Sequence, residues 1–77
     1  MTEFIQINPK IMLGKPVIKG TRITVEHIIS MLAQGISIDE ILIEYNGLKK
    51  EEILACLGYV ENVLEKTTTL DLDKIAS

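Results

Sequence analysis

The sequence predicts a mainly α protein in which a short β arm precedes three helices. Apolar residues recur at helical spacing after Thr24, and Ser37-Ile38-Asp39-Glu40 has the residue pattern of a helix start. Before Thr24, β-forming residues are interrupted by proline and glycine. We therefore expect the 77 residues to form one domain, with a β arm and hairpin over 4–24, a three-helix region over 25–66 and a tail over 67–77.

The β arm is expected to contain a first strand and a tight hairpin. Residues 4–7 have β character, and Asn8-Pro9 predicts the turn that follows them. Lys19-Gly20 separates the β-rich runs 16–18 and 21–23, which is typical of a hairpin with a two-residue loop. Because so small a sheet is not stable alone, we expect the arm to pack on the helices or to contribute to a homodimer.

Capping residues mark the expected boundaries of the first two helices. The first helix is predicted over 25–34, between an N-cap at Thr24 and a stop at Gly35. The second is predicted over 38–45, where a capping box begins it and Asn46-Gly47 ends it.

A third helix is predicted over 50–65, and the tail over 67–77 is expected either to fray or to form a strand with a partner. The residues predicted to face the core are Val25, Ile28, Ile29, Leu32, Ile38, Ile41, Leu42, Tyr45, Ile53, Leu57, Val60 and Leu64.

The composition favours a protein partner over broad adhesion to nucleic acid. Eight basic and 11 acidic residues give a formal net charge of −3, so nonspecific attraction to phosphate is weak. Hydrophobic residues make up 47% of the chain, which indicates self-association or a partner, unless a compact core takes them all. We find no apolar run of the roughly 20 residues that a membrane span needs and no secretion signal, so we expect a cytoplasmic protein without membrane contact.

Catalysis has little support in these residues. Cys56 and His27 are each the only residue of their type, and both are interpreted as structural. Lys19-Gly20-Thr21 lacks the glycine-rich framework that wraps a phosphate group. We therefore expect no enzymatic activity, no metal site and no cofactor.

The basic residues of the arm form the first candidate site. Arg22 is the only arginine, and its planar guanidinium can hold a carboxylate or a phosphate through two hydrogen bonds. The lysines that precede it are Lys10, Lys15 and Lys19. A β-ribbon lying in a DNA groove would present all four. The alternative is that Arg22 pairs internally with a carboxylate such as Glu26 or Asp39.

The last two helices have the outline of a helix-turn-helix, in which the first turn of the third helix would lie in the major groove. The residues expected to be exposed there are Lys49, Lys50, Glu51 and Glu52. The lysines can contact phosphate, but the glutamates repel it, and no Asn, Gln or Arg lies nearby to read base edges. Three-helix domains that bind only protein show the same pattern.

The chain also resembles a known family over roughly residues 5–60. The resemblance is carried by Gly14-Lys15-Pro16-Val17-Ile18-Lys19-Gly20-Thr21-Arg22-Ile23-Thr24-Val25, Ile28, Leu32, Gly35, Ser37-Ile38-Asp39-Glu40-Ile41-Leu42, Tyr45, Leu48, Glu52-Ile53 and Ala55-Cys56-Leu57-Gly58-Tyr59. These residues are similar to the small prokaryotic proteins called domain of unknown function 433. The chain departs from that pattern at Asn46-Gly47, where a proline is usual, and at Lys49, where a Ser or Thr cap is usual.

The resemblance implies both a fold and a function. The family is similar to homeodomain-like helix-turn-helix proteins, and its members are commonly proposed as antitoxins encoded beside a nuclease-like toxin. We therefore expect a three-helix homeodomain-like bundle that acts as an antitoxin-like regulatory module. Its expected partners are a second copy, a toxin-like nuclease and double-stranded operator DNA. The alternative is a structural protein–protein interaction domain that binds no nucleic acid.

Overall fold

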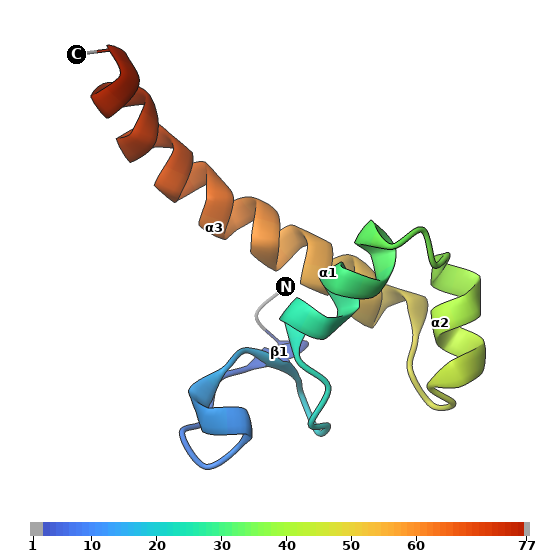
Figure 1. The fold of residues 1–77 in the computed structure, drawn as a ribbon. Helices are drawn as coiled ribbons and strands as arrows, with labels where there is room; N and C mark the ends of the chain where they lie inside the picture. The colour runs from blue at the N-terminus through green and yellow to red at the C-terminus, as the bar shows by residue number, and fades with distance from the viewer. Residues whose placement is uncertain (1–2, 77) are drawn as a thin grey trace.

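The computed structural model has three helices and a small N-terminal sheet (Figure 1), in agreement with the predicted mainly α class. It describes the backbone of residues 3–76 and the side chains of residues 3–67. The elements in chain order are strand β1 (Ile5–Gln6), the 3-10 turn η1 (Met12–Gly14), strand β2 (Val17–Ile18) and helices α1 (Val25–Ala33), α2 (Ile38–Glu44) and α3 (Lys50–Ala76).

Strand β2 is the centre of the arm. It pairs antiparallel with β1, so that Ile5 lies opposite Ile18 and Gln6 lies opposite Val17. On its other edge, Val17 forms a bridge with Thr24. Because both edges are paired, both residues of β2 are completely buried, and the short sheet becomes part of the core.

The predicted two-residue hairpin is wrong in its second strand. Lys19-Gly20 does form a turn, in which Gly20 has a φ of +82° and the Thr21 N–H donates to the Ile18 carbonyl at 2.9 Å. The strand expected over 21–23 does not form, because the Thr21 hydroxyl accepts the Ile23 N–H at 3.0 Å. Backbone pairing resumes only at Ile23, whose carbonyl accepts the Ile18 N–H at 2.9 Å.

Local capping bonds begin and end α1 where the sequence predicts. The Thr24 hydroxyl accepts the His27 N–H at 3.0 Å, as an N-cap does. At the other end Gly35 has a φ of +91°, and the Ile36 N–H donates to the Met31 carbonyl at 3.1 Å. This is the bonding of a Schellman motif, which needs a residue that tolerates the left-handed conformation.

Glutamate side chains help to begin both later helices. The Ser37 N–H donates to Glu40 at 3.0 Å, and the Glu40 N–H donates to the Ser37 hydroxyl at 3.1 Å, which confirms the capping box. The bond from the Ser37 backbone also lowers the pKa of the Glu40 carboxyl. At the start of α3, Lys49 has no capping oxygen of its own, but Glu52 accepts its N–H at 2.8 Å. Half of a capping box therefore begins α3.

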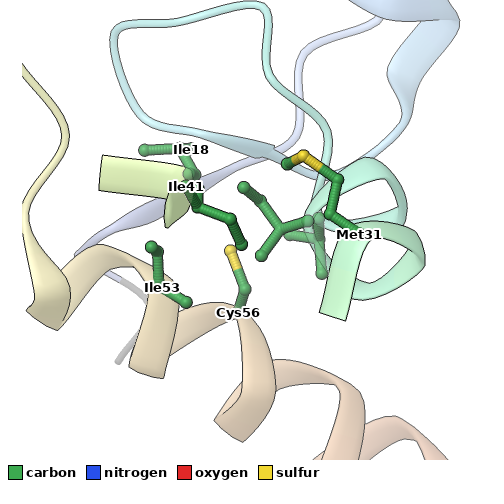
Figure 2. Packing of buried hydrophobic residues seen from close by; sticks show 7 residues of the cluster. Ile18, Met31, Ile41, Ile53 and Cys56 are labelled. Atoms are coloured by element: carbon green, nitrogen blue, oxygen red, sulfur yellow. The ribbon is translucent and has the colours of Figure 1, made fainter. Parts of the chain in front are cut away.

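The core lies where the three helices meet β2 (Figure 2). Its buried residues are Ile18, Val25, Ile28, Met31, Ile41, Ile53 and Cys56. Each of the three helices and β2 contributes at least one of them. The chain therefore holds its body together with a single small apolar cluster.

Helix α3 turns a somewhat different face to the core than predicted. Ile53 and Cys56 are completely buried, and Val60 packs against the core cluster. Leu57 and Leu64 were also predicted to face inward, but they are 40% and 56% exposed. Apolar residues cover so wide an arc of this helix that periodicity alone does not identify the covered side.

Helix α3 is also longer than predicted. It continues to Ala76 through the segment that was expected to fray or form a strand. The Thr67 hydroxyl donates to the Val63 carbonyl at 3.0 Å, a bond by which threonine satisfies its hydroxyl within a helix. Ser77 lies outside the described residues. The C-terminal half of α3 projects away from the body (Figure 1), and the longest axis of the molecule is 48 Å.

Candidate partner-binding surfaces

Over residues 60–67, where α3 leaves the body, the helix is amphipathic. Val60, Val63, Leu64 and Thr67 have the spacing i, i+3, i+4 and i+7, which places them on one face of the helix. Val60 packs against the core, so this face continues the one that the body covers. Val63 and Leu64 are 45% and 56% exposed. We call Val63, Leu64 and Thr67 the open α3 face.

Polar residues lie beside the open α3 face over residues 61–67. Glu61, Asn62 and Lys66 fall between the apolar positions, and all of residues 61–67 are exposed. A helical segment of this length is marginal in water without tertiary packing. A projecting helix with one apolar stripe is typical of an element that lies in a groove of another protein.

The six basic residues predicted to bind nucleic acid are all exposed, but they fall in two groups. Lys10, Lys15, Lys19 and Arg22 lie on the loops of the arm, whereas Lys49 and Lys50 lie at the start of α3. In Figure 1 the loops of the arm project below the body, and α3 begins beside α2. The six residues thus belong to two separate parts of the molecule.

Arg22 makes no ion pair among the residues whose side chains the structure describes, so the predicted internal pair with Glu26 or Asp39 is wrong. Glu26 is paired with Lys15 instead, at 2.9 Å between Nζ and Oε1. Both partners are more than half exposed, so this pair contributes little to stability. The guanidinium of Arg22 therefore stays in solvent and can meet an anion.

The start of α3 carries mixed charge. Lys49, Lys50 and Glu51 are exposed as predicted, but Glu52, also predicted to be exposed, is half-buried, and its carboxylate accepts the Lys49 N–H. Glu51 also lines an open groove of about 220 Å³ with Phe4, Leu54 and Ala55. Carboxylates on the same turn as the lysines reduce any net attraction to phosphate.

An exposed turn in the arm has left-handed backbone angles at two residues other than glycine, which no sequence pattern indicates. Met12 and Leu13 have φ values of 50° and 59°, and Gly14 follows at 82°. The left-handed conformation costs a residue other than glycine roughly 1–2 kcal/mol. Leu13 is 95% exposed and Met12 is 41% exposed. We call Met12 and Leu13 the arm knob.

A further surface is an open groove beside α2. It has a volume of about 490 Å³ and is lined by Ile36, Glu40, Ile43 and Glu44. Ile43 is 81% exposed, so the groove offers apolar area bordered by two carboxylates. We call it the acidic groove.

His27 and Cys56 both have structural positions. His27 Nε2 lies 2.9 Å from the Tyr45 hydroxyl, a hydrogen bond that joins α1 to the end of α2. Burial, with a smaller contribution from the Glu52 carboxylate, raises the pKa of the Cys56 thiol to about 11. A protonated, buried thiol is a poor nucleophile.

The described part of the chain has neither a metal-binding cluster nor a membrane-spanning helix. Within it, no group of His, Cys, Asp and Glu side chains is arranged to hold a metal ion. Nor does any helix there combine the length and the apolar character that crossing a membrane requires.

Comparison with known proteins identifies the family. The model of a family described as a protein of unknown function (DUF433) matches residues 5–60, which is more than half of the chain. The chain belongs to the DUF433 family. Among solved structures, it is similar to a crystal structure of a DUF433 member protein from Anabaena variabilis ATCC 29413, with a TM-score of 0.72 and 31% sequence identity. The alignment covers 96% of this chain and 69% of that chain. Among curated proteins, nothing matches.

The DUF433 match includes the arm and the body and ends at residue 60, where α3 leaves the body. The likeness to the Anabaena protein extends further, since it covers 96% of this chain. The family description names no activity. The function of this DUF433 protein is therefore argued from its exposed surfaces.

Proposed function

We propose that this DUF433 protein is an antitoxin-like regulatory module that binds a toxin-like partner protein through the open α3 face. One observation carries the proposal: Val63 and Leu64 are exposed on the continuation of a helix face that is buried within the body. A partner that covers this face removes apolar surface from water. It also supports a helical segment that is marginal alone.

The charge of the chain suits a toxin-like nuclease as the partner. A nuclease needs a cationic surface to hold the phosphates of its substrate. This chain has a formal net charge of −3, and Glu61, three residues before Leu64, lies beside its open α3 face. Opposite charges around an apolar contact speed the encounter of two proteins and select the correct partner. An acidic helix laid on the cationic surface would also keep substrate away from it.

The proposal is tested by capturing the partner. A tagged full-length chain, incubated at moderate salt with lysate of the cells that make it, is expected to retain a small nuclease-like protein in stoichiometric amount. Mass spectrometry identifies that protein, and an RNA-cleavage assay with the purified pair is expected to show less cleavage than the nuclease alone. Recovery of the chain by itself, or full cleavage in the complex, would contradict the antitoxin-like role.

Operator DNA is a second candidate ligand, which Lys19 and Arg22 favour. Both are exposed, and residues 10–22 contain four basic residues and no carboxylate. If residues 10–22 contact phosphate, fluorescence anisotropy with a DNA duplex at low salt should show binding, and that binding should weaken as salt is added. The Arg22→Gln variant should bind the duplex more weakly than the wild type. A flat titration would favour the alternative, a protein interaction domain without nucleic acid.

A further inference from the structure

We propose that the arm knob of one copy binds in the acidic groove of a second copy, so that the module self-associates through these two surfaces. The inference goes beyond the proposed function, which concerns the toxin-like partner and operator DNA. It names the contact between the copies.

The two residues of the arm knob have an unusual left-handed backbone conformation. Met12 and Leu13 occupy the left-handed region, where glycine and asparagine are favoured. Backbone bonds hold them there: the Gly14 N–H donates to the Ile11 carbonyl, and the Lys15 N–H donates to the Met12 carbonyl, both at 3.1 Å. Leu13 is thereby held almost entirely in solvent. A strained, rigid turn that presents a large apolar side chain is typical of a binding surface.

The acidic groove has chemistry complementary to the arm knob. Its lining residues are Ile36, Glu40, Ile43 and Glu44. Ile43 offers Leu13 an exposed apolar contact, because both side chains are more than four-fifths exposed in the single chain. Lys10 lies three residues before Leu13, and its exposed side chain can meet Glu44 at the rim. Apolar surface thus meets apolar surface, and a cation meets a carboxylate.

The position of the two surfaces indicates a second copy as the occupant. In Figure 1 the turn that carries the arm knob lies at the lower left of the body, and α2 lies at its right. One chain therefore does not bring its own knob to its own groove. Because every copy carries both a knob and a groove, on opposite sides of the body, the knob of one copy can bind the groove of the next in a head-to-tail arrangement.

Leu13→Asn tests the apolar half of the contact without straining the fold. Asparagine tolerates the left-handed conformation, so the thermal midpoint of the variant is expected to equal or exceed that of the wild type. Sedimentation equilibrium of the full-length chain is expected to show a self-association constant weakened by at least about tenfold, because the contact between two copies loses one leucine. Leu54→Gln changes a leucine that is 47% exposed and lies outside both surfaces, so this variant should self-associate like the wild type.

Charge reversal tests the polar half. Lys10→Glu alone and Glu44→Lys alone are each expected to weaken self-association, since each variant places like charges at the contact. An equimolar mixture of the two variants should restore it, because both contacts between unlike copies then join opposite charges. A wild-type chain that stays monomeric, a Leu13→Asn variant that associates like the wild type, or a mixture no stronger than its components would overturn the inference.

Failure of this inference is distinguishable from failure of the proposed function. If the proposed function holds, Leu13→Asn still captures the toxin-like protein, because the open α3 face is unchanged. A wild-type chain that self-associates through the knob but captures no such protein would leave the contact standing and contradict the antitoxin-like role.

Discussion

Ile53→Ala is expected to lower the free energy of unfolding by about 2–5 kcal/mol. Ile53 is completely buried and lies on α3 within the core (Figure 2). Truncating it removes buried methyl groups and leaves a cavity that close-packed neighbours fill only in part. Because small domains have about 5–15 kcal/mol of stability in total, the variant is expected to be partly unfolded at 37 °C. Urea denaturation followed by far-UV circular dichroism measures the loss.

Leu64→Ala is the matched control on the same helix. Leu64 is 56% exposed on the projecting half of α3, so the same kind of truncation is expected to cost less than about 0.5 kcal/mol. Similar losses for Ile53→Ala and Leu64→Ala would show that the buried face of α3 is not the one described.

The double substitution Val63→Gln and Leu64→Gln is expected to weaken binding of the toxin-like partner by at least about a hundredfold, since each lost apolar contact is worth roughly 1.5–3 kcal/mol. Both residues lie on the open α3 face, and neither belongs to the buried core. Glutamine is a good helix former, so the thermal midpoint should stay close to that of the wild type. Biolayer interferometry with the captured partner measures the dissociation constant.

Asn62→Gln with Lys66→Gln is the control for this double substitution. It places two glutamines on the polar side of the same helical segment, where both native residues are exposed. Partner binding is expected to change by less than about fivefold, as for rim positions of an interface. Equal losses from the two double variants would mean that binding does not depend on which side of α3 faces the partner.

Helix boundaries could be predicted from the sequence because they depend on neighbouring residues. The Thr24 cap and the Ser37–Glu40 capping box are each closed by hydrogen bonds that span three residues. Gly35 ends α1 through its own left-handed conformation. Such bonds form wherever the local backbone bends correctly, so their pattern can be recognised before the fold is known.

Tertiary packing determined most of the features that sequence patterns missed. The exposure of Leu57 depends on which side of α3 the body covers, and that of Leu64 depends on where α3 leaves the body. The pairing of β2 on both edges likewise depends on distant residues: ten residues separate it from β1, and its other edge pairs with Thr24. The continuation of α3 to Ala76 has a different cause, because this half of the helix projects from the body: adding a residue to an existing helix is easier than starting one, and the helix extends through three consecutive threonines despite their β propensity.

The candidate site was only partly predictable for the same reason. The six basic residues are exposed as expected, because lysine and arginine rarely lose their hydration. Their partners were not predictable: Lys15 reaches Glu26 across eleven positions of the chain, whereas Glu26 had been considered only as one alternative partner of Arg22. The arm knob depends on unusual backbone angles, and the acidic groove depends on how Ile36 lies beside α2, neither of which residue patterns encode.

Amide hydrogen exchange at residues 61–67 tests most directly whether the open α3 face is a binding surface. In the free chain these amides are expected to exchange quickly, because all seven residues are exposed and the segment has little tertiary support. With saturating toxin-like partner, their exchange is expected to slow by at least about tenfold, while that of α2 stays the same. Unchanged exchange at residues 61–67 within a formed complex would contradict the proposal that this face binds the partner.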